Sequence, residues 1–133
     1  MTHETTSGEP LVVKASMFSD VPKKPTLFNL EGKHQNWGKV EIALRIFNLD
    51  HDVITLNGLE QMKTDWFKQI HPDQMIPAFM DNADGKRIVL WDSTSILLYL
   101  CEKYDKDGVW AGKDWAEKSE VLNWLMFHTA TFQ

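Results

Sequence analysis

The chain has 133 residues, of which 43% are hydrophobic and 25% charged, and its formal net charge is −5. This length supports one compact domain with its own core but is short for two, and the composition excludes a disordered or fibrous chain. The negative charge, the scattered lysines and the lack of an apolar run near the ~20 residues of a membrane span argue against nucleic-acid and membrane partners, so we expect a soluble, cytoplasmic protein.

The first half of the chain predicts a strand–helix–strand unit. Residues 1–25 show no sustained period and carry three prolines, which indicates a mobile or loosely docked extension. A β-prone run at 26–29 precedes a turn at 30–35 and then a helix to about residue 48, which Asn36 can cap. A second strand at 53–56 completes a βαβ unit, in which the strands are parallel.

The second half predicts a short helix, a hairpin and a longer helix. The spacing of Trp66, Phe67 and Ile70 predicts a helix over 64–71 that Pro72 stops. A strand at 76–80, a turn at 81–85 and a returning strand at 87–91 form an antiparallel hairpin. The clearest helix covers 93–104, and another begins near Asp114. The predicted order is β-α-β-α-β-β-α, an α/β arrangement, followed by the start of an extra helix.

The only cysteine is Cys101, which excludes an internal disulfide and a Cys-x-x-Cys redox pair. Because it lies on the apolar stripe of the 93–104 helix, we interpret it as a core residue and not as a nucleophile.

This order of elements carries two short motifs at defined places. Met75-Ile76-Pro77 heads the third strand, and Trp-Asp-Ser-Thr-Ser-Ile at 91–96 opens the third helix. Together they resemble the N-terminal domain of glutathione S-transferases over about 26–133, and the stretches 28–44 and 110–132 are most similar to the fungal branch that includes the yeast prion-forming nitrogen regulator. The resemblance implies an extension at 1–25, a thioredoxin-like glutathione-binding domain at 26–105, and a linker with the first helix of an incomplete helical domain at 106–133.

The resemblance assigns glutathione-binding roles to Met75, Ile76 and Pro77. In the family the bond equivalent to Ile76-Pro77 is cis, so that the backbone of Ile76 pairs with the cysteinyl part of glutathione like an added edge strand. The alternative is a trans proline that marks a sheet edge.

Asp92 and Ser93 stand where the fourth strand gives way to a helix. Free N–H groups at a helix N-terminus suit a carboxylate and Asp92 suits an ammonium, so the pair fits the γ-glutamyl end of glutathione. The alternative is that either residue only caps the helix. Lys63 lies near the place where the family contributes a basic residue to the glycine carboxylate.

Asn36 aligns with the asparagine of the nitrogen regulator's branch, because the loop at 30–37 lacks the tyrosine, serine or cysteine that other classes use. Lowering the thiol pKa by two units requires about 2.7 kcal/mol, more than the roughly 0.3–1 kcal/mol of a helix dipole, so a direct hydrogen bond is needed. Asn36 is the catalytic candidate, with a plain N-cap as the alternative. His34 and Gln35 are second candidates.

The resemblance implies a glutathione transferase that uses glutathione as co-substrate and a hydrophobic electrophile as acceptor, without a metal. Fungal detoxification or secondary-metabolite synthesis fits, including glutathione-assisted cis–trans isomerisation. The alternative is a non-catalytic module for dimerisation or regulation. Trp110, Trp115 and Trp124 are candidates for lining an acceptor pocket or for packing. Since the helix over 121–132 leaves apolar positions uncovered, we expect self-association, as in a homodimer.

Overall fold

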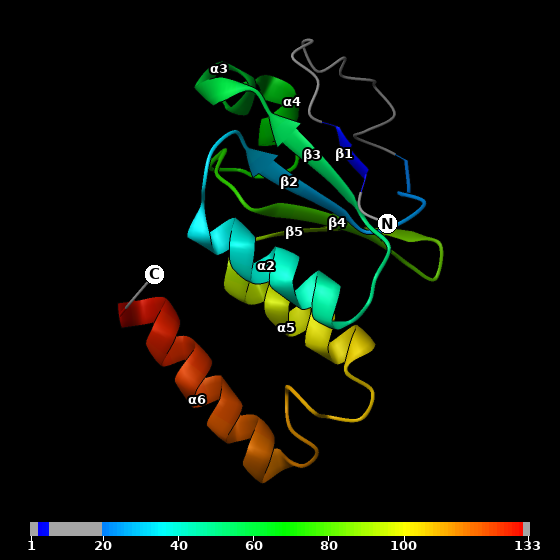
Figure 1. Ribbon diagram of the computed structural model, residues 1–133, viewed down its shortest axis with the longest axis vertical. Coiled ribbons are helices and arrows are strands. Elements are labelled where there is room, and N and C mark those ends of the chain that lie inside the picture. Colours follow the sequence, from blue (N-terminus) through cyan, green and yellow to red (C-terminus); the bar gives the residue numbers. More distant parts are fainter. Residues whose placement is uncertain (1–2, 6–19, 132–133) are drawn as a thin grey trace.

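The computed structural model describes residues 3–5 and 20–131. Its five-stranded sheet has the order β1-β3-β2-β4-β5 (Figure 1). β1, β2 and β3 are mutually parallel where they pair, whereas β4 is antiparallel to β2 and β5 antiparallel to β4. The elements are β1 (His3–Thr5), β2 (Thr26–Leu30), α2 (Gln35–Ile46), β3 (Asp52–Leu56), α3 (Gly58–Met62), α4 (Asp65–Lys68), β4 (Ala78–Ala83), β5 (Lys86–Trp91), α5 (Ser93–Tyr104) and α6 (Trp115–Thr131).

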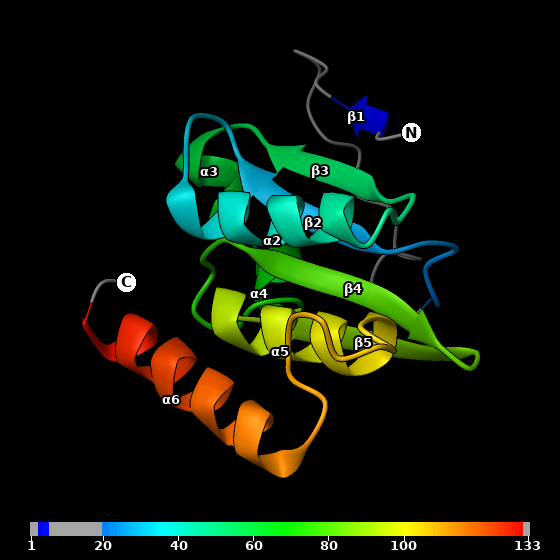
Figure 2. The same ribbon diagram turned by 60° about the horizontal axis from the view of Figure 1, so that its bottom comes forward.

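The sheet has a core on each face, because successive side chains of a strand point to opposite sides. Leu27 and Phe79 face α2 and α5, which lie side by side across the sheet in Figures 1 and 2. Phe28 and Met80 face the other way and pack with residues of α3 and α4. Two neighbouring residues of β2 and two of β4 thus anchor both layers, and an α/β sandwich results, as the sequence predicts.

The hairpin is tighter than the predicted turn over 81–85. Strand pairing continues to Ala83 opposite Lys86, so only Asp84 and Gly85 form the turn, and both have positive φ. A two-residue turn with positive φ at both positions suits the twist of a hairpin. Asp81 therefore lies inside β4 and is buried.

Several other boundaries differ from the expectations. The polar segment after residue 58 forms α3, and the helix expected at 64–71 is shortened to the four residues of α4. The extension was expected to dock loosely, yet its residues 3–5 pair with β3 as an unpredicted parallel strand. The rest of the extension up to residue 19 lies outside the described residues.

α6 is set apart from the sandwich. Figure 2 shows it running beside α5, away from the sheet, and none of its described residues is buried. Polar contacts between α6 and the sandwich include that of Lys39 Nζ, which donates to His128 Nε2 at 3.3 Å, and that of the Thr94 and Thr129 hydroxyls, which lie 2.6 Å apart. In the described part of the chain, no helix combines the length and hydropathy that crossing a bilayer would require.

Candidate functional site

A groove of about 420 Å³ opens at the N-terminal end of α2. It forms there because α2 starts directly after β2, and the antiparallel pairing of β2 with β4 brings the chain entering β4 to the same end of the sheet. Three predicted site residues, Asn36, Met75 and Ile76, meet in this groove. Its lining residues are Leu30, Lys33, His34, Gln35, Asn36, Met62, Met75 and Ile76.

Asn36 is not the cap of α2. The helix begins at Gln35 with His34 as its N-cap, and the His34 carbonyl accepts the first helical hydrogen bond from the Gly38 amide at 3.1 Å. Asn36 is the second helical residue, so the capping interpretation is wrong. Its Oδ1 is buried and has no hydrogen-bond partner among the described residues. Such an orphaned atom requires an explanation, because most buried polar atoms are paired.

The Ile76-Pro77 peptide bond is cis, as the resemblance implied. Pro77 is buried and directly precedes β4, while Met75 is exposed and Ile76 half-buried. Within the described ranges, the backbone N–H and C=O of Ile76 have no hydrogen-bond partner. Unpaired backbone groups beside a groove can pair with a bound peptide.

Asp92 caps α5. Its Oδ1 accepts a hydrogen bond from the Thr94 amide at 2.8 Å, and its φ is 72°. The cap uses one carboxylate oxygen; the other accepts no hydrogen bond from the residues that the structure describes. Ser93 is only 1% exposed, so its hydroxyl lies beneath the surface of the helix start. Neither residue lines the groove that contains Asn36.

Two basic side chains that the sequence did not single out interact with the charge of Asp92. Burial lowers the pKa of Lys39, against the opposing charge of Asp92. Burial likewise lowers the pKa of His71, against the opposing charges of Asp73 and Asp92. The sequence contained a signal for Lys39, because this residue follows Asn36 by about one helical turn and so lies on the same face of the helix. His71 gave no such signal, since its approach to Asp92 depends on the fold.

The remaining candidates lie outside the groove. Lys63 is exposed at the C-terminal end of α3, next to the groove residue Met62. Trp115 and Trp124 are exposed on α6, and Trp110 on the loop before it, so none of the three packs in the core. Burial and the charge of Asp105 raise the pKa of the Cys101 thiol, which disfavours the reactive thiolate. No group of three or more metal-ligating side chains occurs in the described ranges.

The family described as "Glutathione S-transferase, N-terminal domain" matches residues 35–108, more than half of the chain. Glutathione S-transferase verG of Clonostachys rogersoniana is 42% identical over 116 residues, which are 87% of this chain and 48% of that protein. The trimodular acetylaranotin synthesis protein ataIMG of Aspergillus terreus is 37% identical over 51% of this chain and 8% of its own length. The chain thus spans less than half of these curated relatives.

The chain is also similar to solved structures of this family. Ure2p in complex with glutathione has a TM-score of 0.71 and 29% identity, over 80% of this chain and 49% of that one. Ure2p5 from Phanerochaete chrysosporium, cocrystallised with 1-(S-glutathionyl)-2,4-dinitrobenzene, has a TM-score of 0.69 and 31% identity, over 84% and 46%. The thioredoxin-like fold, with the helix α6 following it, is therefore confirmed.

Proposed function

The chain belongs to the glutathione S-transferase family, and on that premise we propose that it binds glutathione and adds its thiolate to a hydrophobic electrophile. The observation that carries the proposal is the groove in which Asn36 meets the unpaired backbone of Ile76. The domain limits at 26–105 and 106–133 and the cytoplasmic location are part of the same proposal.

Each part of glutathione has a proposed partner. The cysteinyl backbone pairs with Ile76, and the γ-glutamyl end lies at the start of α5. There the unpaired oxygen of Asp92 accepts from the ammonium, and Ser93 with the helix N-terminus receives the carboxylate. Lys63 approaches the glycine carboxylate from the end of α3. Met75 and Pro77 hold Ile76 in its place.

Asn36 is proposed to activate the thiol. Its oxygen is the atom buried in the protein, which leaves the amide N–H₂ as the group that can face the groove. An N–H donor favours a thiolate over a thiol, and α2 adds the positive end of its dipole because Asn36 lies in its first turn. Donor and dipole together are asked to supply about 2.7 kcal/mol for a two-unit fall in thiol pKa.

The acceptor is proposed to be an electrophilic small molecule of fungal detoxification or secondary metabolism, by conjugation or by glutathione-assisted isomerisation. The conjugate cocrystallised with Ure2p5 and the acetylaranotin synthesis protein among the relatives support these classes. A homodimer is the proposed assembly, because α6 leaves Trp124, Met126 and Phe127 exposed.

The exposed face of α6 also favours the second candidate, a non-catalytic module for dimerisation or regulation. The two functions differ in turnover and not in binding. Calorimetry with glutathione, combined with an assay on 1-chloro-2,4-dinitrobenzene, separates them: binding with turnover supports the transferase, and binding without turnover supports the module. Absence of glutathione binding to the wild-type chain contradicts both.

Asp92 can be tested without disturbing its cap. Asp92→Asn keeps an oxygen for the Thr94 amide, and Asn is as good an N-cap as Asp. Losing the carboxylate charge should weaken glutathione binding by about 1.5–3 kcal/mol while the melting temperature stays within a few degrees. Asp92→Ala with Ser93→Ala removes cap and ligand contacts together, so unchanged affinity in that double variant would reject the assignment.

Asn36 is tested by the pKa of the bound thiol. Asn36→Ala should raise it and lower turnover more than glutathione affinity, and Asn36→Asp should raise it further, because a carboxylate repels the thiolate. Titration of the thiolate by its ultraviolet absorbance measures the pKa of bound glutathione in both variants. An unchanged thiol pKa in both variants would remove Asn36 from catalysis.

A further inference from the structure

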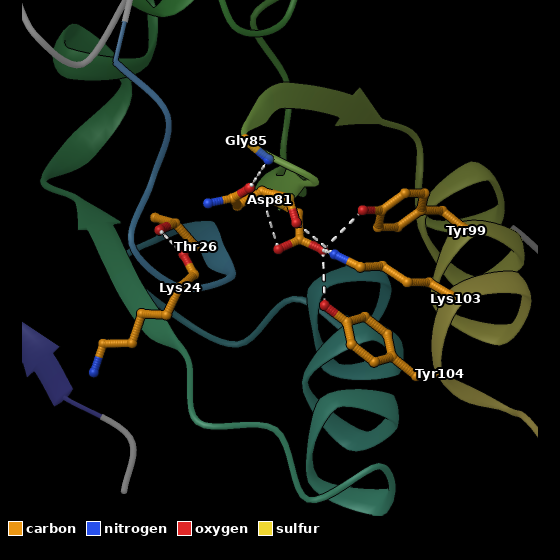
Figure 3. A network of polar contacts seen from close by, with 8 residues as sticks. Lys24, Thr26, Asp81, Gly85, Tyr99, Lys103 and Tyr104 are labelled. Carbon is orange, nitrogen blue, oxygen red and sulfur yellow. Dashed lines mark hydrogen bonds and ion pairs between the residues drawn. The ribbon is translucent and has the colours of Figure 1, made fainter.

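Four side chains join β4 to α5 at the end of the sheet away from the groove. The Asp81 carboxylate is 2% exposed, and its Oδ2 accepts hydrogen bonds from Tyr99 Oη at 2.8 Å, Lys103 Nζ at 2.8 Å and Tyr104 Oη at 2.9 Å. Figure 3 shows the three donors of α5 converging on this one oxygen. We call Asp81, Tyr99, Lys103 and Tyr104 the Asp81 clasp.

Hydrogen bonds to both oxygens compensate the buried charge of Asp81. Oδ1 of Asp81 accepts from the Asn82 amide at 2.7 Å, and Lys103 also donates to the Asn82 carbonyl at 2.6 Å. The Lys103 ammonium lies over both tyrosine rings, 5.7 Å from the Tyr99 centroid and 5.0 Å from that of Tyr104. Apolar residues of similar volume often replace such buried ion pairs without loss of stability. Apolar residues cannot replace the directional constraint that these hydrogen bonds place on α5 relative to β4, because hydrogen bonds weaken steeply when misaligned.

The clasp also touches α2. The Tyr104 ring packs against Phe47, which directly follows α2, with 6.5 Å between centroids. The Tyr99 ring packs against Phe79 of β4 at 6.1 Å. One cluster therefore joins the C-terminal ends of α2 and α5 to β4.

The ends of these three elements that lie away from the clasp carry the proposed site residues. Figures 1 and 2 show α2, β4 and α5 running in the same direction across the sandwich. Asn36 is in the first turn of α2, Ile76 lies two residues before β4, and Asp92 caps α5. From Ser93 to Lys103 the rise of an α-helix is about 15 Å, so one continuous helix connects the clasp to the Asp92 cap.

We propose that Asp81 is a positioning residue of the glutathione site, which sets the placement of α5 relative to β4 and so the geometry between Asp92 and Ile76. This inference rests on the proposed function. Glutathione must reach both elements at once: its cysteinyl part pairs with the segment before β4 and its γ-glutamyl end with the start of α5. A sliding or rotation of α5 at the clasp changes the span between them.

The test separates placement from stability. Asp81→Leu removes the carboxylate shared by Lys103 and the two tyrosine hydroxyls, so the Lys103 ammonium loses its counter-charge. Asp81→Leu with Lys103→Met removes both charges and keeps an apolar contact. We expect the double variant to recover most of the melting temperature lost in the single variant. Measured by calorimetry well below the melting temperature, glutathione binding in both should be about tenfold weaker than in wild type.

Asp105 supplies the matched control. Its carboxylate also accepts three hydrogen bonds, from the amides of Val109, Trp110 and Ala111 at 2.8–3.0 Å, but these come from its own loop and not from β4. Asp105→Asn should bind glutathione like wild type. Wild-type affinity in the Asp81→Leu/Lys103→Met variant, or an equal loss in Asp105→Asn, would overturn the proposal. If the double variant does not fold, Tyr99→Phe with Tyr104→Phe replaces it as the test. We expect its glutathione affinity to be about threefold weaker, and an unchanged affinity would contradict the proposal.

A second readout needs no ligand. Hydrogen exchange of the Thr94 amide, which donates to Asp92, should accelerate in folded clasp variants relative to core amides of β2. If the wild-type chain fails to bind glutathione, the proposed function fails, and this exchange alone decides the clasp. Unchanged Thr94 exchange then overturns it.

Discussion

Both the sandwich and α6 carry large apolar side chains, but only the sandwich buries them. Phe28 and Phe79 are at most 1% exposed between the sheet and its helices, whereas Trp115 and Trp124 of α6 are 86% and 65% exposed. The Asp81 clasp links helix α5 to β4 through hydrogen bonds to a buried carboxylate. Helix α6 contacts the sandwich through the polar pairs Lys39–His128 and Thr94–Thr129. A helical pattern alone therefore does not place a helix. Stability comes from the surface against which its apolar face is buried.

The largest expected effect is in the sandwich core. Phe79→Ala removes a fully buried ring that packs with α2 and α5, so it should lower the free energy of unfolding by about 3–5 kcal/mol. Trp124→Ala removes a larger ring from a mostly exposed position and should change it by less than about 0.5 kcal/mol. Urea denaturation measures both, and comparable losses would show that α6 belongs to the same cooperative core.

The next effect concerns a buried carboxylate on α2. Glu41 Oε2 is 2.8 Å from Nε2 of the buried His51, and Oε1 accepts from Arg45 Nε at 2.8 Å. Glu41→Gln leaves a charge-assisted contact unmade inside the sandwich, so we expect a loss of about 1–3 kcal/mol. Arg45→Ala, at the exposed end of the same network, should lose less than about 1 kcal/mol. Reversal of that order in denaturation curves would refute the assignment.

The clasp should weaken at alkaline pH. Burial, the hydrogen bond to Asp81 and its charge raise the pKa of Tyr99 to about 12, and the same causes raise that of Tyr104. A raised folded pKa means that stability is fully present below pH 10 and is lost as pH rises through about 12. Tyr99 and Tyr104 are the only two tyrosines in the chain, so tyrosinate absorbance reports on the clasp alone. Asp81→Asn should shift this titration toward pH 10; an unshifted curve would contradict the role of Asp81.

The smallest effect is expected where α6 meets α5. Thr94→Val removes the hydroxyl contact with Thr129, and it should change the global free energy of unfolding by about 0.5 kcal/mol or less, because α6 can detach without opening the sandwich. Hydrogen exchange should nevertheless accelerate throughout α6. Faster exchange in β2 as well would join the two regions into one cooperative unit.

Local patterns predicted the elements whose signals lie within a few residues. Helix α5 covers 93–104 as its apolar stripe predicts, and Met75 and Ile76 of the proline motif line the same groove as Asn36. The errors occurred where distant segments decide. Asp81 reads as a turn residue by its neighbours, yet donors 18 to 23 residues later keep it in a strand. β1 depends on the free edge of β3, which no pattern in the extension reveals.

The sequence by itself determined the α/β order and the family resemblance, and it supplied the candidate residues of a glutathione site, because strand and helix periods and short motifs are local properties of the chain. Only the tertiary structure decided that Asn36 is a helical residue with a buried, unpaired oxygen and that the charge of Asp92 acts on Lys39 and His71. It alone also gathered three donors around Asp81. Burial and convergent hydrogen bonds join residues that are far apart in sequence, so they arise only when the chain is folded.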